Sequence, residues 1–145
     1  ESAKWFQLAA DQGDAYAQNE LGVLYRNGRG IPQDDQESAK WFQLAADQGN
    51  AAAKDNLDKL RRKSLRFEET LYRAQQGDAE AQMLVGEMYY FGEGVPRDYS
   101  EAARWWRKAA YQGNASAQYN LGLLYETGGK GVEEAVKKFA WLLFS

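Results

Sequence analysis

The sequence predicts an all-α fold made of helix-turn-helix repeats, and three observations support this prediction. The thirteen residues ESAKWFQLAADQG at 1–13 return unchanged at 37–49, a step of 36 residues. Apolar residues within each step recur at helical spacing, and patterns typical of strands are almost absent. Tryptophans keep the same register along the chain, as expected for an array of repeated units.

The register divides the chain into about four repeats, of which one is short. Trp5, Trp41, Trp105 and Trp141 follow one another at steps of 36, 64 and 36 residues. The Gly-Asp or Gly-Asn pairs follow at steps of 36, 28 and 36 residues. The long step is therefore one full period plus a repeat that lacks eight residues.

The chain opens within the second helix of a pair, at 1–13, and the first helix of the next pair follows it. Asp14 suits the N-cap of that first helix, and Gly28 suits a left-handed position at its end. Its apolar positions are Ala15, Ala17, Leu21, Leu24 and Tyr25.

The loop GRGIPQD at 28–34 connects this helix to the second helix of the pair. Asp34 suits the N-cap of the second helix, and Glu37 stands three residues later, as in a capping box. The second helix is predicted to end at Gly49. Residues 78–113 repeat the same two helices and the same loop.

Glycines and aromatic residues at fixed positions indicate how the helices pack. Gly22, Gly86 and Gly122 stand inside predicted first helices, where glycine costs about 1 kcal/mol relative to alanine. Their recurrence predicts a close approach of two helices that a Cβ atom would block. The tryptophans, which are in phase, are predicted to fill wider gaps between helices rather than to form a carbohydrate platform.

The repeat can be written A-x-A-Q-x-x-L-G-x-x-Y-x-x-G-x-G-[IV]-P-x-D-x-x-x-A-x-x-W-[FW]-x-x-A-A-x-Q-G-[DN]. The residues that carry it are Ala15, Ala17, Leu21, Gly22, Tyr25, Gly28, Gly30, Asp34, Ala39, Trp41, Ala45, Ala46 and Gly49, and again Ala79, Ala81, Val85, Gly86, Tyr89, Gly92, Gly94, Asp98, Ala103, Trp105, Ala109, Ala110 and Gly113. This pattern resembles the Sel-one-like repeat (SLR) family, relatives of the tetratricopeptide solenoids.

The resemblance implies a right-handed α/α superhelix, or solenoid, of about four 36-residue repeats. It also implies a scaffold or adaptor that binds proteins or peptides on the superhelical surface. Members of the family include bacterial envelope, regulatory and effector-immunity proteins and eukaryotic adaptors of membrane-bound complexes.

The second repeat departs from the pattern. Asp58 takes the place of the close-contact glycine, Arg61 takes the place of the tyrosine, and the Gly-x-Gly loop is missing. A carboxylate in a tight apolar helix contact is costly, so a different packing is expected after this point. Residues 50–63 are therefore predicted to form a helix like those that cap repeat arrays.

This departure divides the chain into SLR repeats at 1–63 and a second SLR segment at 64–145. A helix break near Ser64 is the favoured prediction, because a serine there can cap a new helix. The alternative is one uninterrupted helix through to Gln76.

The last repeat departs as well. The second loop glycine is displaced to Gly131, and Lys138 and Phe139 replace an alanine pair, while Trp141 stays in register. The apolar end FAWLLFS is expected to pack on a further repeat or on a partner, which indicates part of a longer array.

Composition excludes several function classes. The 145 residues contain no histidine and no cysteine, which excludes Ser-His-Asp and Cys-His nucleophiles, imidazole or thiolate metal sites, and disulfides. The net charge of -3 gives no electrostatic basis for nucleic-acid binding, and no apolar run approaches the ~18 residues of a membrane span. We expect no catalytic residue, no metal and no cofactor. Localisation stays open between periplasmic or exported and cytoplasmic, because a signal peptide would lie outside a sequence that begins at Glu1.

Charged clusters are interpreted as helix caps and solvated faces. Paired acids stand at Asp34-Asp35, Glu68-Glu69 and Glu133-Glu134. Sequence neighbours on a helix point apart, whereas a glycan hydrolase needs two carboxylates that converge across a cleft. A basic cluster comprises Arg61, Arg62, Lys63 and Arg66. Nearby acids dilute it, so a solvated face is favoured over an anion site.

First-helix positions outside the repeat pattern are predicted to face solvent or a partner, at spacing i, i+4, i+7 and i+11. We call them the first-helix stripe. They are Tyr16, Glu20, Val23 and Asn27; Glu80, Leu84, Glu87 and Phe91, flanked by Met83 and Tyr90; and Ser116, Asn120, Leu123 and Thr127, flanked by Tyr119. Clustered apolar and aromatic residues on a surface favour a binding patch. The alternative is that Met83, Leu84 and Phe91 pack against neighbouring repeats.

Together these features predict a non-catalytic scaffold that binds a protein or peptide on its concave first-helix surface. Two alternatives stay open. One is a glycan-acting enzyme based on carboxylates. The other is end-to-end self-association through Trp5-Phe6 and the segment Trp141 to Phe144.

Overall fold

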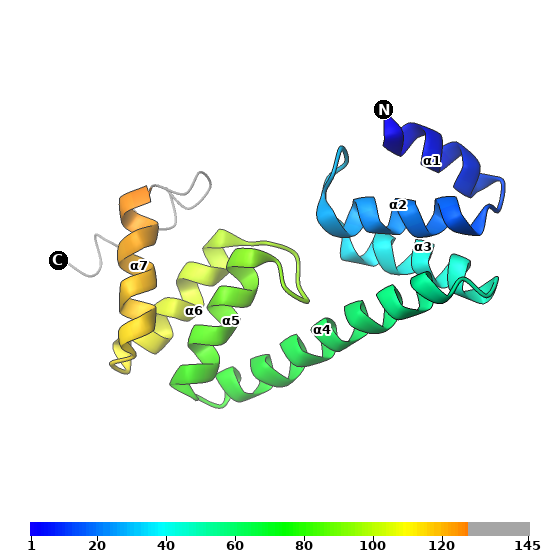
Figure 1. Cartoon of the computed structure of the whole chain (residues 1–145). Coiled ribbons are helices and arrows are strands. Elements are labelled where there is room, and N and C mark those ends of the chain that lie inside the picture. The colour runs from blue at the N-terminus through cyan, green and yellow to red at the C-terminus, as the bar shows by residue number, and fades with distance from the viewer. Residues whose placement is uncertain (128–145) are drawn as a thin grey trace. The chain divides into compact units, whose positions relative to one another are not determined.

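The computed structural model of the chain describes residues 1–127, and within them it contains seven helices and no strand (Figure 1). The helices are α1 (Ser2–Asp11), α2 (Ala15–Asn27), α3 (Asp35–Asp47), α4 (Ala51–Gln75), α5 (Ala79–Phe91), α6 (Tyr99–Tyr111) and α7 (Ala115–Thr127). The predicted all-α helical repeat is confirmed. The chain divides into two compact units, Glu1–Lys63 and Ser64–Ser145.

The predicted helix ends are confirmed by their hydrogen bonds. The carboxylates of Asp14 and Asp34 each accept a backbone N–H from the first turn of α2 and α3. Gly28 ends α2 in the left-handed region at φ 66° and ψ 35°, a conformation that side chains with a Cβ rarely adopt. The predicted capping box is wrong in one half: Glu37 forms an ion pair with Lys40 at 2.5 Å, and the Asp34 N–H donates instead to the carbonyl oxygen of Tyr25 at 2.9 Å.

The close helix contact predicted at the mid-helix glycines is confirmed in both units. A Cβ placed on Gly22 would lie 2.6 Å from the ring of Phe42, and one on Gly86 would collide with the indole of Trp106. These aromatic side chains come from α3 and α6, and both are buried. The position in register with them that would face Gly122 lies among residues 128–145, outside the described residues.

The prediction that tryptophans fill the interhelical core is correct for Trp105 and wrong for Trp5. Trp105 is 4% exposed, and Trp41 packs beside Leu21. Trp5 is 63% exposed although its sequence context matches that of Trp41. Trp41 packs on a cluster to which α1 contributes Ala10 and α2 contributes Leu21, whereas no helix precedes α1 among the described residues. Trp141, Gly131, Lys138 and Phe139 lie outside the described residues.

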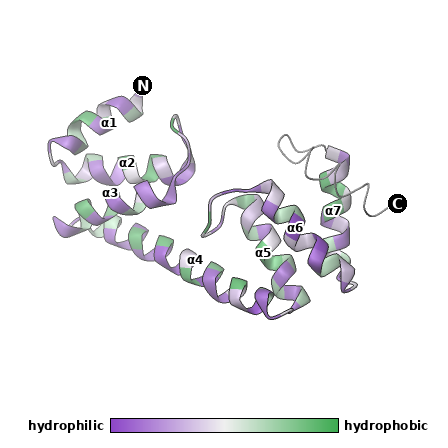
Figure 2. Ribbon diagram, turned by 180° about the vertical axis from the view of Figure 1, so that it is seen from behind, coloured by the Kyte–Doolittle hydropathy of each residue, from purple (hydrophilic) through white to green (hydrophobic). Residues whose placement is uncertain are grey.

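Residues 51–75 form the single helix α4, so the predicted break near Ser64 is wrong and the alternative is correct. This segment holds neither glycine nor proline. Figure 2 shows α4 as a hydrophilic ribbon interrupted by short hydrophobic stretches. Its buried or half-buried apolar residues are Ala53, Leu57, Leu60, Phe67, Leu71 and Ala74. They follow one another at steps of four, three, seven, four and three residues. The step of seven, from Leu60 to Phe67, is two helical turns, so the apolar face keeps its register across Ser64 and the helix continues (Figure 1).

The first three of these residues pack against Phe42 and Ala45 in the first unit. The last three pack with Val85 and Trp105 in the second unit. The cap-like helix predicted at 50–63 is therefore polar on one face only. No helix within residues 1–127 combines the length and the apolar character that crossing a bilayer requires.

Glutamines of the repeat pattern connect three consecutive helices by hydrogen bonds. The Gln82 side chain donates from Nε2 to the carbonyl oxygen of Ala74 at 3.1 Å and accepts from Gln112 at 2.8 Å. Gln18 makes the same two bonds in the first unit, to Ala10 and from Gln48. We call this arrangement the glutamine ladder.

Candidate protein-binding surface

In the first unit the predicted stripe on α2 is mostly exposed. Tyr16 is 79% exposed, and Glu20 and Asn27 are also exposed. Val23 differs, because it is half-buried and packs against the cluster that contains Phe42. The outer face of α2 therefore offers one large aromatic ring among polar side chains.

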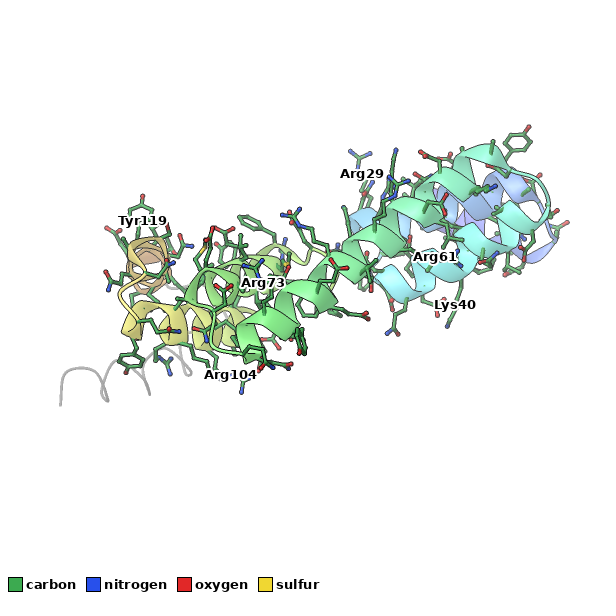
Figure 3. The ribbon with its side chains drawn as sticks, turned by 90° about the horizontal axis from the view of Figure 1, so that it is seen from below. Arg29, Lys40, Arg61, Arg73, Arg104 and Tyr119 are labelled. Atoms are coloured by element: carbon green, nitrogen blue, oxygen red, sulfur yellow. The ribbon has the colours of Figure 1, made fainter. Side chains whose placement is uncertain are left out.

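In the second unit the stripe carries larger apolar side chains. Phe91 on α5 is 56% exposed, while Tyr119 and Leu123 on α7 are 66% and 40% exposed. Tyr119 projects from the surface of α7 (Figure 3). The remaining positions are half-buried at Leu84, Glu87 and Asn120 and exposed at Glu80, Ser116 and Thr127. Exposed apolar groups thus stand on both first helices described in this unit, α5 and α7.

Two predicted flanking residues pack inward instead of standing free. Met83 and Tyr90 are half-buried against the cluster that contains Trp106. The Tyr90 ring lies 5.5 Å from that of Trp106, and 5.0 Å from those of Tyr99 and Phe91. Phe91 is thus the exposed member of an aromatic group, and its neighbour Tyr90 is held by contacts with Tyr99 and Trp106.

The sequence prediction left out the stripe of the broken second repeat. A step of 36 residues from Glu20, Val23 and Asn27 leads to Asn56, Lys59 and Lys63 on α4. Arg26 on α2 donates to the Oδ1 atom of Asn56 at 3.0 Å. The 36-residue step of the repeat would have predicted these stripe positions from the sequence.

Basic side chains and one leucine line a half-open surface pocket of about 230 Å³ between α2 and the first part of α4. Its lining residues are Arg26, Lys59, Leu60, Arg62 and Lys63. All of them belong to the first unit. Lys59 and Lys63 are stripe positions of the second repeat, whereas Arg26, Leu60 and Arg62 are not. Arg61, Arg62, Lys63 and Arg66 are all exposed, as expected for the solvated face that the sequence predicts.

Asp35, at the start of α3, is one of the acidic groups that interact with this basic set; Asp55 is another, through its ion pair with Lys59. Burial raises the pKa of Asp35 from its ordinary 3.8, while attraction by Lys63 and Arg26 opposes that rise. Its Oδ1 atom is buried and has no hydrogen-bond partner. The carboxylate therefore offsets only part of the positive charge beside it.

The other charged clusters have structural roles or face solvent. Asp34 caps α3, and Glu68 and Glu69 are exposed on α4. The guanidinium of Arg61 donates to Gln43 at 2.8 Å. Arg66 is exposed, and the pair Glu133-Glu134 lies outside the described residues. Within residues 1–127, no group of three or more acidic side chains is arranged to hold a metal ion.

The Sel1 repeat family model matches the chain at residues 1–14, 15–50, 79–114 and 115–144. The chain belongs to the Sel1-repeat family. The stretch 51–78, which the model leaves unmatched, is where the sequence departs from the repeat. Sel1-repeat proteins commonly mediate protein–protein interaction, and the family is generally non-catalytic.

Curated relatives match over a short stretch of these Sel1 repeats. The ERAD-associated E3 ubiquitin-protein ligase components HRD3A and HRD3B of Arabidopsis thaliana are each 42% identical over 55 residues. Human protein sel-1 homolog 2 is 41% identical over 56 residues. Each match covers 38% of this chain but only 8% or 9% of the relative's length.

Two solved structures resemble the chain along almost all of its length. One is a protective antigen present in uropathogenic Escherichia coli strains that displays an SLR fold, at 33% identity and a TM-score of 0.47. The match covers 96% of this chain and 32% of the antigen. The other is a Sel1 repeat protein from Oxalobacter formigenes, at 31% identity and a TM-score of 0.43, which covers 97% of this chain and 62% of that protein.

Proposed function

We propose that this chain is a non-catalytic scaffold that binds a protein or peptide through its first-helix stripe. The observation that carries the proposal is the exposure of Phe91, Tyr119 and Leu123 on the first helices of one compact unit. Aromatic and aliphatic side chains at the centre of an interface supply much of its binding energy. Leu84, Glu87 and Asn120 stand between them in the stripe and complete the proposed surface.

The way in which the aromatic group is held favours this role. Tyr90 contacts Tyr99 and Trp106, so the neighbouring Phe91 is supported by side chains that already pack together. A partner that covers Phe91 therefore orders few additional groups, which lowers the entropic cost of binding. Tyr16, Glu20 and Val23 form the corresponding surface of the first unit.

The experiment selects binding peptides from a displayed random library against the whole chain and then measures their affinity for variants. Tyr119→Ala and Leu84→Glu are expected to weaken binding about tenfold or more, because each removes an apolar contact at the proposed interface. Tyr111→Ala is the matched control: Tyr111 is 67% exposed in the same unit but lies at the end of α6. Circular dichroism checks that each variant keeps its helices.

Affinity that falls with Tyr111→Ala and not with Tyr119→Ala would contradict the proposed surface. The finer prediction of a bacterial envelope, regulatory or effector-immunity role stays a prediction, because the curated relatives are plant and human proteins. The glycan-acting alternative also stays a prediction, and the generally non-catalytic nature of the family argues against it.

Self-association is a second candidate, and the exposure of Trp5 on α1 favours it. The other predicted end of that contact, Trp141 to Phe144, lies outside the described residues. Sedimentation velocity over a range of concentrations tests it. A dimer that dissociates on Trp5→Glu supports this candidate, whereas a monomer at the highest concentration rejects it.

A further inference from the structure

The pocket of Arg26, Lys59, Leu60, Arg62 and Lys63 gives the first unit a surface chemistry that its repeat pattern does not predict. We propose that this pocket binds a carboxylate side chain within an acidic segment of the protein partner. The inference rests on the proposed function, and it adds the class of partner that the first unit selects.

Positive charge at the pocket exceeds the negative charge that opposes it. Four cationic side chains line the pocket, and one of them, Lys59, forms an ion pair with Asp55 at 2.8 Å. Asp35 is the second carboxylate, and it interacts with Lys63 and Arg26. Asp34, which acts electrostatically on Asp35, is a third carboxylate. Four cations therefore face three carboxylates, which leaves one positive charge in excess for an anionic group.

Arg26 is held in place before any partner arrives. It donates to Asn56 at 3.0 Å, and Asn56 in turn donates to the Oδ1 atom of Asn19 at 3.1 Å. The guanidinium also lies over the ring of Phe42, 5.8 Å from its centroid. A cation fixed in this way loses little conformational freedom when it binds a carboxylate.

The apolar part of the pocket suits an amino-acid side chain. Leu60 is 7% exposed and gives the pocket an apolar wall, and the stems of Arg62 and Lys63 add methylene groups beside it. A glutamate presents methylenes and a single negative charge, which matches this mixture. A phosphate has no apolar stem, so it would leave the wall formed by Leu60 uncovered.

The same positions in the second unit have different chemistry. A step of 64 residues converts Asn19 to Met83, Arg26 to Tyr90 and Lys59 to Leu123. The two units thus present a basic and an apolar version of one surface. Selection of acidic sequences is expected to belong to the first unit alone.

The experiment measures fluorescence anisotropy of a labelled peptide of about a dozen residues, alternating Glu and Ser, on adding the whole chain. A Gln-Ser peptide of the same length and a thymidine oligonucleotide of similar charge are the comparison probes. The variants are Arg62→Glu in the pocket and Arg61→Glu as its matched control, since Arg61 is the preceding residue and hydrogen-bonds to Gln43 instead (Figure 3).

Arg62→Glu is expected to weaken binding of the Glu-Ser peptide about tenfold or more, and Arg61→Glu by less than about twofold. The wild-type affinity is expected to fall steeply between about 50 and about 300 mM NaCl. Equal losses in the two variants, equal binding of the Gln-Ser peptide, or preferred binding of the oligonucleotide would overturn the proposal.

The experiment on the acidic peptide can fail or succeed independently of the experiment that tests the scaffold role. Library peptides whose binding depends on Tyr119 in the second unit report on the scaffold role, whatever the Glu-Ser peptide does. If they bind and the Glu-Ser peptide does not, the acidic-partner inference fails and the scaffold proposal stands.

Discussion

At the residue scale, a missing methyl group sets how closely two helices approach. Gly22 and Gly86 both face an aromatic ring from the following helix, and the ring occupies the space that a Cβ would take. In the second unit the indole of Trp106 also donates to the carbonyl oxygen of Met83 at 3.1 Å. Close approach thus gives both dispersion contact and a hydrogen bond at one place.

Gly86→Ala is therefore expected to lower the free energy of unfolding by about 1–3 kcal/mol, the usual cost of overpacking a core. Helix propensity alone predicts the opposite, a gain of about 1 kcal/mol. Urea unfolding measures the difference. A double-mutant cycle with Trp106→Leu serves as control, because the penalty should shrink when the indole is removed. A more stable Gly86→Ala variant would refute the close contact.

The effect of Asp35 on folding stability is expected to change with pH in the direction opposite to that of most carboxylates. Burial raises its pKa above 3.8, so the folded chain holds this proton more tightly than the unfolded chain. Stability then falls as pH rises through the interval between 3.8 and the raised value. Asp35→Asn should stabilise the protein at pH 7 by a few tenths of a kcal/mol after solvent screening, and this gain should vanish below about pH 3.5.

Thermal unfolding of both proteins from pH 3 to 7 measures the effect, with Asp55→Asn as a control of opposite sign. Lys59 lowers the pKa of Asp55 through a hydrogen bond and its charge, so Asp55 contributes stability that is present above 3.8 and lost as pH falls. Asp55→Asn is expected to lose stability at pH 7. A pH-independent difference for Asp35→Asn would contradict the assignment.

At the element scale, the glutamine ladder shows how the repeat pattern connects helices by polar bonds. Gln82 is 5% exposed, whereas Gln118 makes the same bond to the carbonyl oxygen of Ala110 in an exposed position. Gln82→Glu cannot donate to Ala74 and buries a charge, so it should cost about 1–3 kcal/mol. Gln118→Glu should cost less than about 1 kcal/mol, because water replaces the lost bond. Equal costs, measured by urea unfolding, would show that the ladder adds nothing through burial.

The continuity of α4 can be tested at the residue where a break was expected. If Ser64 lies inside a helix, Ser64→Ala should be neutral or slightly stabilising, because alanine is the better helix former. If Ser64 capped a second helix, the same change would cost about 1 kcal/mol. Ser64→Pro should cost about 3 kcal/mol or more in a continuous helix. Urea unfolding with far-UV circular dichroism distinguishes the two cases.

At the scale of the whole molecule, the sequence predicts structure well wherever the repeat pattern holds. Caps such as Asp14 and close contacts such as that of Gly22 can be predicted because the same residue types recur at the same repeat positions. Such recurrence indicates a structural role, since it would not arise by chance. The pattern fails in α4, where a serine suits both a cap and a helix interior, and only the spacing of apolar residues on both sides decides.

The sequence predicts only part of the candidate surface, because helical spacing shows which face of a helix is exposed but not which side chains contact another helix. Exposure of Tyr16 and Tyr119 follows from helical spacing alone, since each lies opposite the packed face of its own helix. Met83 turns inward because the large indole of Trp106, on another helix, offers it a contact. The basic pocket joins Arg26 to residues more than thirty positions later, so no local pattern shows it.

The absence of histidine and cysteine gives a prediction for the whole chain. Among the carboxyl groups with shifted pKa values, those of Asp55 and Asp78 lie below 3.8, and burial raises that of Asp35 from 3.8. Lys40 and Tyr89 have pKa values raised from 10.5 and 10.0, so their contributions are complete at neutral pH and are lost only in alkali.

The midpoint of thermal unfolding should therefore change by less than about 2 °C between pH 6 and pH 8, and reductant should not move it. Scanning calorimetry at constant ionic strength measures this. Salt must be held fixed, because charge screening rather than proton binding would otherwise move the midpoint. A change of several degrees would require a group that titrates near neutrality, and with no histidine in the sequence that group would have to be a strongly shifted acid or amine.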